Sequence, residues 1–247
     1  MINLTQEEVN STYFLVKRYL EKKEKREYPR DFDFLTPTDK LLALMYSELA
    51  LKKAFAIEEE VTEDLMSLQS EIGVLKGLEH RIKPFDRILE KTVSDSIIDY
   101  GGSFKRAANN INDSVRYTFV IPDDKYIENI DKCLHRLEDI GYQVVEFKNK
   151  WRAADFKGIN VRLVAKNNND IFEIQFHTPL AYRIKEGDSK SNSDRSTRAL
   201  YQVSRDKRAP EWLRLKADKL RRYLQTFIMI PDGALEYQFD RDIRRSK

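Results

Sequence analysis

Residues 172–178 read FEIQFHT, and this stretch decides how the middle of the chain folds. Apolar and polar residues alternate along it, which predicts a β-strand with one apolar face and one polar face. The polar face presents a carboxylate, an amide and an imidazole, from Glu173, Gln175 and His177. Because a carboxylate and an imidazole can both move protons, the strand is either the solvated side of an edge strand or a strand that presents groups to a substrate.

The sequence around this strand predicts a small mixed core. The NNND turn at residues 167–170 lies between two apolar-rich runs, which predicts an antiparallel hairpin. An amphipathic stripe that ends at Gly141 predicts a helix before them. Strands are predicted at residues 114–122, 142–148, 159–166 and 171–177, and the helix at residues 125–141. The order β-α-β-β-β indicates the α+β class, with a mixed sheet of about four to five strands flanked by helices.

The N-terminal third has the pattern of helices. TQEE at residues 5–8 matches a capping box, in which a Thr and a Glu satisfy each other's backbone N–H groups. A Thr-Pro pair suits the start of a second helix, and paired glycines break a later one. Helices are therefore predicted from Thr5, from Thr36-Pro37, from Thr62 to about Leu78, and from Pro84 to the break at Gly101-Gly102.

The C-terminal part has a polar loop at residues 187–194 and two predicted helices, over residues 195–208 and 210–227. The chain shows no internal repeat and no clear linker. We therefore expect one compact domain with three regions. These are a helical region over residues 1–77, a core over residues 78–205 and a helical extension over residues 206–247.

The composition narrows the class of protein. Of 247 residues, 41% are hydrophobic and 34% are charged, which indicates a soluble globular protein. A net charge of +3 is too small to argue for nucleic-acid binding on charge alone. The single Cys133 excludes an internal disulfide, and three histidines argue against a zinc site.

The sequence shows neither the pattern of a membrane-spanning segment nor that of a signal peptide. No hydrophobic run approaches the length of a membrane span, and the first residues lack the apolar centre of a signal peptide. We therefore expect no membrane association and a cytoplasmic site of action. Secretion by a route that reads no such signal stays open.

A basic segment lies before the predicted sheet. RIKPFDRILEK, at residues 81–91, contains Arg81, Lys83, Arg87 and Lys91. The last three are four residues apart, so on a helix they would share one face and could bind a polyphosphate. Taken alone, the segment is better explained as a solvated basic face, because charged helix faces are common.

Two carboxylates, Asp113 and Glu173, are candidate metal ligands when they are considered together with the basic segment. Asp113 precedes a strand of alternating apolar residues, and Glu173 follows it by 60 residues on a strand expected nearby. Carboxylate oxygens suit Mg²⁺, which completes its shell with water or phosphate. With the basic segment in front, the two acids predict a metal–nucleotide site. Strict alternation would point Arg116 away from the face that carries Asp113.

A loop with aromatic residues follows the third predicted element of the core. WRAADFKGINVRL, at residues 151–163, includes Trp151, Phe156 and Lys157. The aromatic rings could stack on a base, and the lysine could contact a phosphate. Alternatively, this sequence is explained by a β-turn at Gly158 beside an aromatic residue of the core.

Together these motifs resemble the RelA/SpoT-type pyrophosphokinase, or alarmone synthetase, family over about residues 78–205. The basic segment resembles the ATP-binding segment of the family, and FEIQFHT resembles its Glu-Ile-Gln-x-Arg-Thr strand. The similarity is greater to a toxin- and effector-like branch. That branch has motifs similar to DSVRYT, KNKW, FKGIN and EIQFHTP, which occur here in that order.

The resemblance implies a nucleotidyltransferase-like synthetase fold. It also implies Mg²⁺-dependent transfer of pyrophosphate from ATP to the 3′-hydroxyl of a purine nucleotide, or to a tRNA 3′ end. An immunity or antitoxin protein becomes a candidate partner. Asp113 would bind Mg²⁺, and Glu173 would be a second ligand or the base that deprotonates the acceptor hydroxyl. The implied ATP-binding residues are Arg81, Lys83, Arg87, Lys91 and Arg116, and the implied acceptor-binding residues are Phe156, Lys157, Asn160, Gln175 and His177.

Two other functions stay open. After His177 the branch pattern continues with Lys-Glu, a His and Leu-Tyr-Glu, whereas this chain has Gln202 in place of that Glu and lacks the His. A nucleotide-binding module that has lost catalysis is therefore one alternative. A nucleotidyltransferase that moves a nucleoside monophosphate is the other, although the Asp-x-Asp pair typical of such enzymes is missing, since position 115 is Val.

Overall fold

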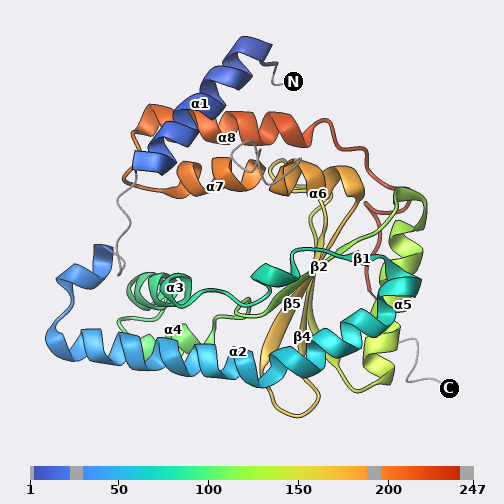
Figure 1. Cartoon of the computed structure of the whole chain (residues 1–247), viewed down its shortest axis with the longest axis horizontal. Coiled ribbons are helices and arrows are strands. Elements are labelled where there is room, and N and C mark those ends of the chain that lie inside the picture. The colour runs from blue at the N-terminus through green and yellow to red at the C-terminus, as the bar shows by residue number, and fades with distance from the viewer. Residues whose placement is uncertain (1–2, 23–29, 188–195, 240–247) are drawn as a thin grey trace.

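A five-stranded mixed sheet forms the centre of the structure, a computed structural model that describes residues 3–22, 30–187 and 196–239 (Figure 1). The strand order is β1-β2-β5-β4-β3, with β2 and β5 parallel and every other pair antiparallel. This confirms the predicted mixed sheet and the β4–β5 hairpin, whereas β1 was not predicted. The strands are β1 (Val74–Leu75), β2 (Arg116–Val120), β3 (Gln143–Asn149), β4 (Ile159–Val164) and β5 (Ile171–His177).

Helices surround the sheet. The α-helices are α1 (Gln6–Lys22), α2 (Pro37–Ile72), α3 (Phe85–Ile98), α4 (Phe104–Asn109), α5 (Tyr126–Asp139), α6 (Pro179–Glu186), α7 (Thr197–Arg205) and α8 (Glu211–Gln225). Short 3-10 helices occur at η1 (Arg30–Phe34), η2 (Leu78–His80) and η3 (Asp123–Lys125). The predicted polar loop at residues 187–194 lies, apart from Gly187, outside the described residues.

Local sequence signals explain where several helices begin. At α1 the capping box is confirmed, because the Thr5 N–H donates to the Glu8 carboxylate at 2.7 Å and the Glu8 N–H donates to Thr5 Oγ1 at 3.2 Å. At α2 the Thr36 hydroxyl accepts from the Asp39 N–H, with Pro37 as the first helical residue. The short helix α6 starts in the same way at Thr178 and Pro179.

The separate helix predicted from Thr62 to about Leu78 is wrong. Helix α2 runs unbroken for 36 residues and already contains Thr62. No glycine or proline occurs between residues 38 and 72, so nothing in the sequence ends the helix before Gly73. The residues after Gly73 form strand β1, and the sequence patterns also missed α4 and α6.

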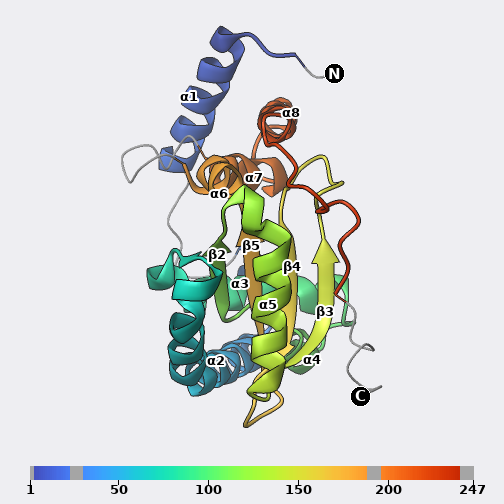
Figure 2. The same cartoon turned by 90° about the vertical axis from the view of Figure 1, so that its right-hand side faces the viewer.

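The main core lies on the apolar face of the sheet. Helix α5 and the second half of α2 cover this face, as Figure 2 shows for α5. Phe119 of β2 stacks on Phe176 of β5, with ring centroids 6.0 Å apart. A second cluster joins α1, α7 and α8 in a separate helical layer (Figure 1). None of the helices in the described ranges has the length and apolarity needed to cross a bilayer.

Candidate functional site

The polar face of β5 lies in the middle of the sheet, not at a solvated edge. Its exposed fractions are 6% for Glu173, 4% for Gln175 and 1% for His177. Strand β2 pairs with β5 along one edge and β4 pairs along the other, so neither edge of β5 is free. In this register Arg116 lies beside Glu173, and Asn160 lies opposite Gln175. The interpretation of FEIQFHT as the wet side of an edge strand is therefore wrong.

Lys83 reaches the site through backbone pairing. The Lys83 N–H donates to the Ser114 carbonyl at 2.8 Å, and the Arg116 N–H donates to the Arg81 carbonyl at 2.8 Å. These bonds hold residues 81–83 antiparallel to the start of β2. Because α3 begins at Phe85, Lys83 is not on the helix, and the predicted single helical face for Lys83, Arg87 and Lys91 is wrong.

Three cations surround the carboxylate of Asp113. Lys83 Nζ lies 2.6 Å and Lys91 Nζ 3.0 Å from Oδ1, and an Arg116 Nη lies 2.6 Å from Oδ2. Burial raises the pKa of Asp113, but the charges of the three cations outweigh it and leave that pKa well below its usual range. Burial also lowers the pKa of Lys83 to about 8, although Asp113 opposes this.

Arg116 connects the two candidate carboxylates. Its Nε lies 2.8 Å from Glu173 Oε1, as an ion pair outside hydrogen-bond alignment, while its Nη binds Asp113. The expectation that Arg116 points away from Asp113 is wrong. Asp113 lies in the turn before β2, so strand alternation does not fix its direction.

Glu173 has a second partner on the same strand. Gln175 Nε2 donates to Glu173 Oε1 at 2.6 Å, and Gln175 Oε1 accepts from Lys185 Nζ at 2.8 Å. The sequence patterns assign no role to Lys185 or Glu186. In the sequence, only the position of this Lys-Glu pair after FEIQFHT could have indicated a role. The contact between Lys185 and Gln175 itself depends on how α6 folds back on β5.

Two of the five predicted ATP-binding cations lie away from Asp113. Arg81 forms an ion pair with Glu58 of α2 and donates to the Leu78 carbonyl at 2.8 Å. Arg87 pairs with Glu90 on the exposed side of α3, at 2.6 Å. The structure thus brings Lys83, Lys91 and Arg116 together, but not Arg81 or Arg87.

The predicted acceptor side forms one group around His177. The ring of Phe156 meets that of His177 edge to face, with centroids 5.1 Å apart. His177 Nδ1 lies 3.0 Å from the Lys157 carbonyl, which can only accept, so Nδ1 carries the proton and Nε2 is an acceptor. Burial, and then Lys185, lower the pKa of His177 well below its usual value, so the imidazole is neutral. The buried Nε2 and the buried Asn160 Oδ1 have no protein partner within the described chain.

Hydrogen bonds within the loop over residues 151–157 stabilise its conformation. Lys157 Nζ donates to the carbonyls of Trp151 and Ala153, at 2.7 and 2.8 Å, so its ammonium is occupied by the loop. Trp151 is fully buried and packs edge to face on Tyr126 in the core. The suggestion that Trp151 stacks on a base is therefore wrong, while Phe156 stays partly exposed.

The donor set at the site suits Mg²⁺. Asp113 and Glu173 supply two carboxylates held on one guanidinium. No group of three or more His, Cys, Asp or Glu residues suited to a metal occurs in the described ranges. Two carboxylates are the usual protein share of an Mg²⁺ shell that phosphates and waters complete, so these residues fit Mg²⁺.

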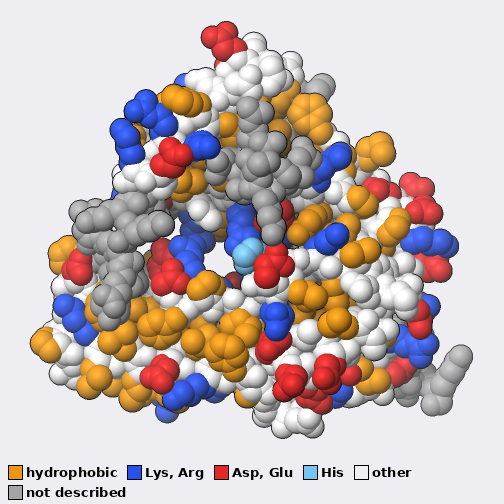
Figure 3. Space-filling view, in the orientation of Figure 1, with side chains coloured by type: hydrophobic (Ala, Val, Ile, Leu, Met, Phe, Trp, Pro, Cys, Tyr) orange, Lys and Arg blue, Asp and Glu red, His pale blue; other side chains and the backbone are white. Residues whose placement is uncertain are grey.

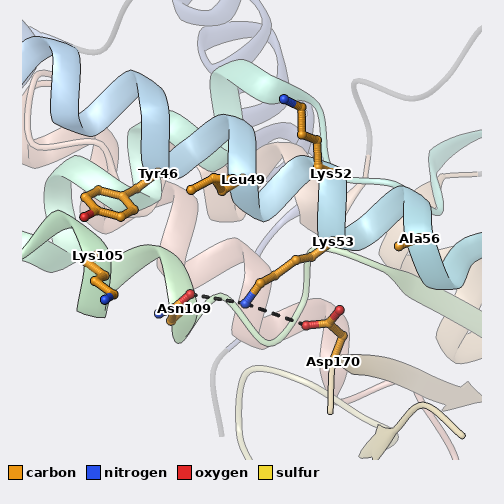
Figure 4. A pocket seen from close by; sticks show the side chains of 8 residues that line it. All are labelled: Tyr46, Leu49, Lys52, Lys53, Ala56, Lys105, Asn109 and Asp170. Atoms are coloured by element: carbon orange, nitrogen blue, oxygen red, sulfur yellow. Dashed lines mark hydrogen bonds and ion pairs between the residues drawn. The ribbon is translucent and has the colours of Figure 1, made fainter. Parts of the chain in front are cut away.

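The surface is hollowed in more than one place. Figure 3 shows a hollow near the middle of one face, between the layer of α2 and the layer of α7 and α8, rimmed by side chains of both charges. A separate open cavity of about 490 Å³ lies between α2, α4 and residue 170 (Figure 4). Lys53 crosses it and contacts Asn109 at 3.3 Å and Asp170 at 3.8 Å. None of the residues that line this cavity is a predicted site residue.

Comparisons with known proteins found matches only among solved structures. No protein family and no curated protein matches the sequence. The type VI effector Tas1, solved in complex with its immunity protein, is 20% identical over 72% of this chain and 94% of its own, with a TM-score of 0.47. The small alarmone synthetase 1 from Bacillus subtilis is 13% identical over 74% and 88%, with a TM-score of 0.45. The protein smu.1046c from Streptococcus mutans UA159 is 9% identical over 72% and 86%, with a TM-score of 0.44. Similarity at this level leaves the activity of this chain to be argued from its own residues.

Proposed function

We propose that this protein is a Mg²⁺-dependent pyrophosphokinase, which transfers the β,γ-pyrophosphate of ATP to the 3′-hydroxyl of a purine nucleotide and releases AMP. One observation carries the proposal. Asp113 and Glu173 are 60 residues apart in sequence, yet both bind Arg116 at the junction of β2 and β5, with two lysines on Asp113. The order of the sequence motifs supports the same reaction class.

The chain itself would contribute charge and position. Lys83, Lys91 and Arg116 would neutralise the ATP phosphates, and a bidentate guanidinium also fixes their direction. Arg81 and Arg87 would reach ATP only after leaving Glu58 and Glu90. Asp113 and Glu173 would hold Mg²⁺, which would neutralise charge on the transferred group.

Glu173 would also take the proton of the acceptor hydroxyl. The 3′-oxygen would then bond to the β-phosphorus, and the bond from that phosphorus to the oxygen bridging to the α-phosphate would break, so AMP leaves with the bridging oxygen. Little covalent chemistry falls to the protein, because orientation and charge stabilisation supply most of the rate.

The acceptor would bind on the His177 side. Phe156 would stack on the base, while Asn160, Gln175 and His177 would offer polar atoms. Lys157 would hold the loop in place, since its ammonium already binds two carbonyls of that loop.

A product survey tests the proposal. The protein is incubated with ATP and Mg²⁺ and, in turn, GDP, GTP, ADP, AMP or tRNA, and the products are analysed by mass spectrometry. AMP together with a pyrophosphorylated acceptor is expected. Nucleotide affinity without turnover would instead favour the binding module, and transfer of a nucleoside monophosphate would favour the nucleotidyltransferase.

Two variants test the carboxylate roles. Asp113→Asn and Glu173→Gln should each lower turnover by at least about 100-fold, because each removes charge from the reacting centre. Asp232→Asn is the matched control, since Asp232 is an exposed carboxylate outside the site. Circular dichroism separates lost chemistry from lost fold. Retained turnover in either folded variant would refute its role.

The likeness to toxin- and effector-like motifs extends the proposal to a growth-inhibiting protein with an immunity or antitoxin partner. Expression in a bacterial host should slow growth, and Asp113→Asn should relieve that effect. Normal growth with soluble, active protein would refute this extension while leaving the reaction intact.

A further inference from the structure

Lys185 contacts the site without touching either carboxylate. Its side chain exposes only 19% of its surface, and its Nζ lies 2.8 Å from Gln175 Oε1. An ammonium group donates and cannot accept, so Gln175 must turn its carbonyl oxygen toward Lys185. The amide nitrogen of Gln175 then faces Glu173, where it donates at 2.6 Å.

The same chain of bonds fixes one oxygen of Glu173. Gln175 Nε2 and Arg116 Nε both contact Oε1, at 2.6 and 2.8 Å. Among the described residues, none makes a hydrogen bond to Oε2. One oxygen of Glu173 is therefore anchored, and the other stays available to a ligand or a proton.

The surroundings of Lys185 show how its charge is accommodated. Lys185 Nζ lies 3.3 Å from Glu186 Oε1, and Glu186 Oε2 lies 3.1 Å from an Arg198 Nη of α7. Burial lowers the pKa of Lys185 to about 8, although Glu186 opposes this. The group is therefore mostly protonated at pH 7. Helix α6, which begins directly after β5, places it over Gln175.

We infer that Lys185 is a positioning residue that acts through Gln175, holding Glu173 with Oε1 anchored and Oε2 directed to the acceptor hydroxyl. This inference rests on the proposed function for its catalytic consequence. Its structural part, the orientation of the Gln175 amide by Lys185, does not depend on any reaction.

A double-mutant cycle tests the catalytic part. Lys185→Met should lower kcat on the order of 10- to 100-fold, the usual cost of losing an outer partner of a site, with little change in the KM for ATP. Gln175→Met should cost at least as much, and the double variant should resemble Gln175→Met alone. Effects that multiply, or a loss confined to KM, would overturn the inference, because Lys185 would then act independently of Gln175.

Two further variants separate positioning from folding. Lys185→Arg keeps a charged donor and should retain more turnover than Lys185→Met. Lys219→Met removes an exposed lysine of α8 and should leave turnover unchanged. Equal losses in Lys185→Arg and Lys185→Met, both folded, would count against a role for the donated hydrogen bond.

A measurement without turnover tests the structural part. In ¹⁵N–¹H spectra, the side-chain amide of Gln175 should shift in Lys185→Met, stay near its wild-type position in Lys185→Arg, and be absent from Gln175→Met. An unchanged amide in Lys185→Met would overturn the inference even in an active enzyme. If the wild-type protein lacks turnover, the proposed function fails, and the amide signal alone then decides whether Lys185 orients Gln175.

Discussion

Arg116 holds together two acidic groups that would otherwise repel each other. Its guanidinium contacts Asp113 at 2.6 Å and Glu173 at 2.8 Å, through two different nitrogens of the group. Without a bound cation, this arginine is the positive charge common to both acids. A divalent cation bound between Asp113 and Glu173 would likewise reduce their repulsion. The effect of Mg²⁺ on stability therefore tests this site without a nucleotide.

Arg116→Met should lower the free energy of unfolding by about 1 to 3 kcal/mol, since the hydrogen bond to Asp113 and the ion pair with Glu173 are lost. Millimolar Mg²⁺ should then raise the Tm of the variant more than that of the wild type, because the ion replaces the missing charge between the carboxylates. Thermal unfolding with and without Mg²⁺ measures both effects. An equal Mg²⁺ response in the two proteins would contradict binding by Asp113 and Glu173.

Glu58 gives a prediction about acid stability. Burial raises the pKa of Glu58, but hydrogen bonds from Arg81 and Thr62 outweigh it and lower that pKa below its usual value. A carboxyl with a lowered pKa stabilises the fold above its unfolded pKa, which is about 4.3, and this contribution is lost as pH falls through the folded pKa. Glu58→Gln should therefore cost about 1 to 3 kcal/mol at pH 7 and progressively less below about pH 4.

Urea unfolding of Glu58→Gln and wild type across this pH range measures the difference. Glu48→Gln, at an exposed carboxylate of the same helix, should show little effect at any pH, because exposed pairs contribute little. A Glu58→Gln deficit that stays constant down to pH 3 would disprove the link to the carboxyl charge.

At the scale of elements, the start of β4 is built around Gly158. Its φ is +149°, and a Cβ there would lie 2.7 Å from the Phe176 carbonyl oxygen and 2.9 Å from His177 Nδ1. The close approach lets β4 run beside the end of β5. Only glycine allows that approach without moving the His177 ring.

Gly158→Ala should destabilise the protein by about 1 to 3 kcal/mol and raise the KM for the acceptor more than that for ATP, because His177 is displaced. Steady-state kinetics and thermal unfolding measure the two parts. Gly102→Ala is the control, since Gly102 also has a positive φ, +87°, but its Cβ would meet no atom within 4 Å. A similar acceptor effect in both variants would argue against displacement of His177.

Sequence patterns predicted elements well where one local signal decides. The alternation in β5, the turn at residues 167–170 and the caps of α1 and α2 are such signals, and the structure confirms the elements they predict. The patterns failed where packing decides. Strand β1 has only two residues and exists because it pairs with β2, and the place of Lys83 comes from backbone bonds with the start of that strand.

The candidate site divides in the same way. That Asp113 and Glu173 belong together could be inferred from motif order, and their shared contact with Arg116 is consistent with it. The contact of Lys185 with Gln175 could not be inferred from the sequence, since it depends on the angle at which α6 leaves β5. Nor could the patterns show that Arg87 pairs with Glu90 instead of facing Asp113.

At the scale of the whole molecule, Arg221, a buried arginine of α8, joins that helix to the loop over residues 151–158. Arg221 is 9% exposed and lies 2.9 Å from Asp155 in the loop and 2.7 Å from Asp218 in its own helix. Its guanidinium also lies over the ring of Tyr201 in α7, 5.2 Å from the centroid. Asp155 directly precedes Phe156, so the C-terminal layer helps to fix where that ring lies.

Arg221→Met should therefore raise the KM for the acceptor several-fold and leave the KM for ATP nearly unchanged, while lowering stability by about 1 to 3 kcal/mol through the lost hydrogen bonds to Asp155 and Asp218. Kinetics at a temperature well below the Tm of the variant separate the two effects. Arg222→Met is the control, because Arg222 is exposed on the same helix and pairs only with Asp218 among the described residues. Equal KM changes for both nucleotides would refute a role restricted to the loop.

The central place of β5 also constrains how the chain can fold. Among the described residues, β5 is the last strand to be synthesised, yet it inserts between β2 and β4. Until residues 171–177 leave the ribosome, those two earlier strands keep unpaired edges, and such edges favour aggregation. The contact between positions 116 and 173 is also long-range, and contacts of this kind slow folding. A nascent chain therefore cannot bring Asp113 and Glu173 together until β5 has been synthesised. Any pyrophosphokinase activity would begin only after most of the chain has been made.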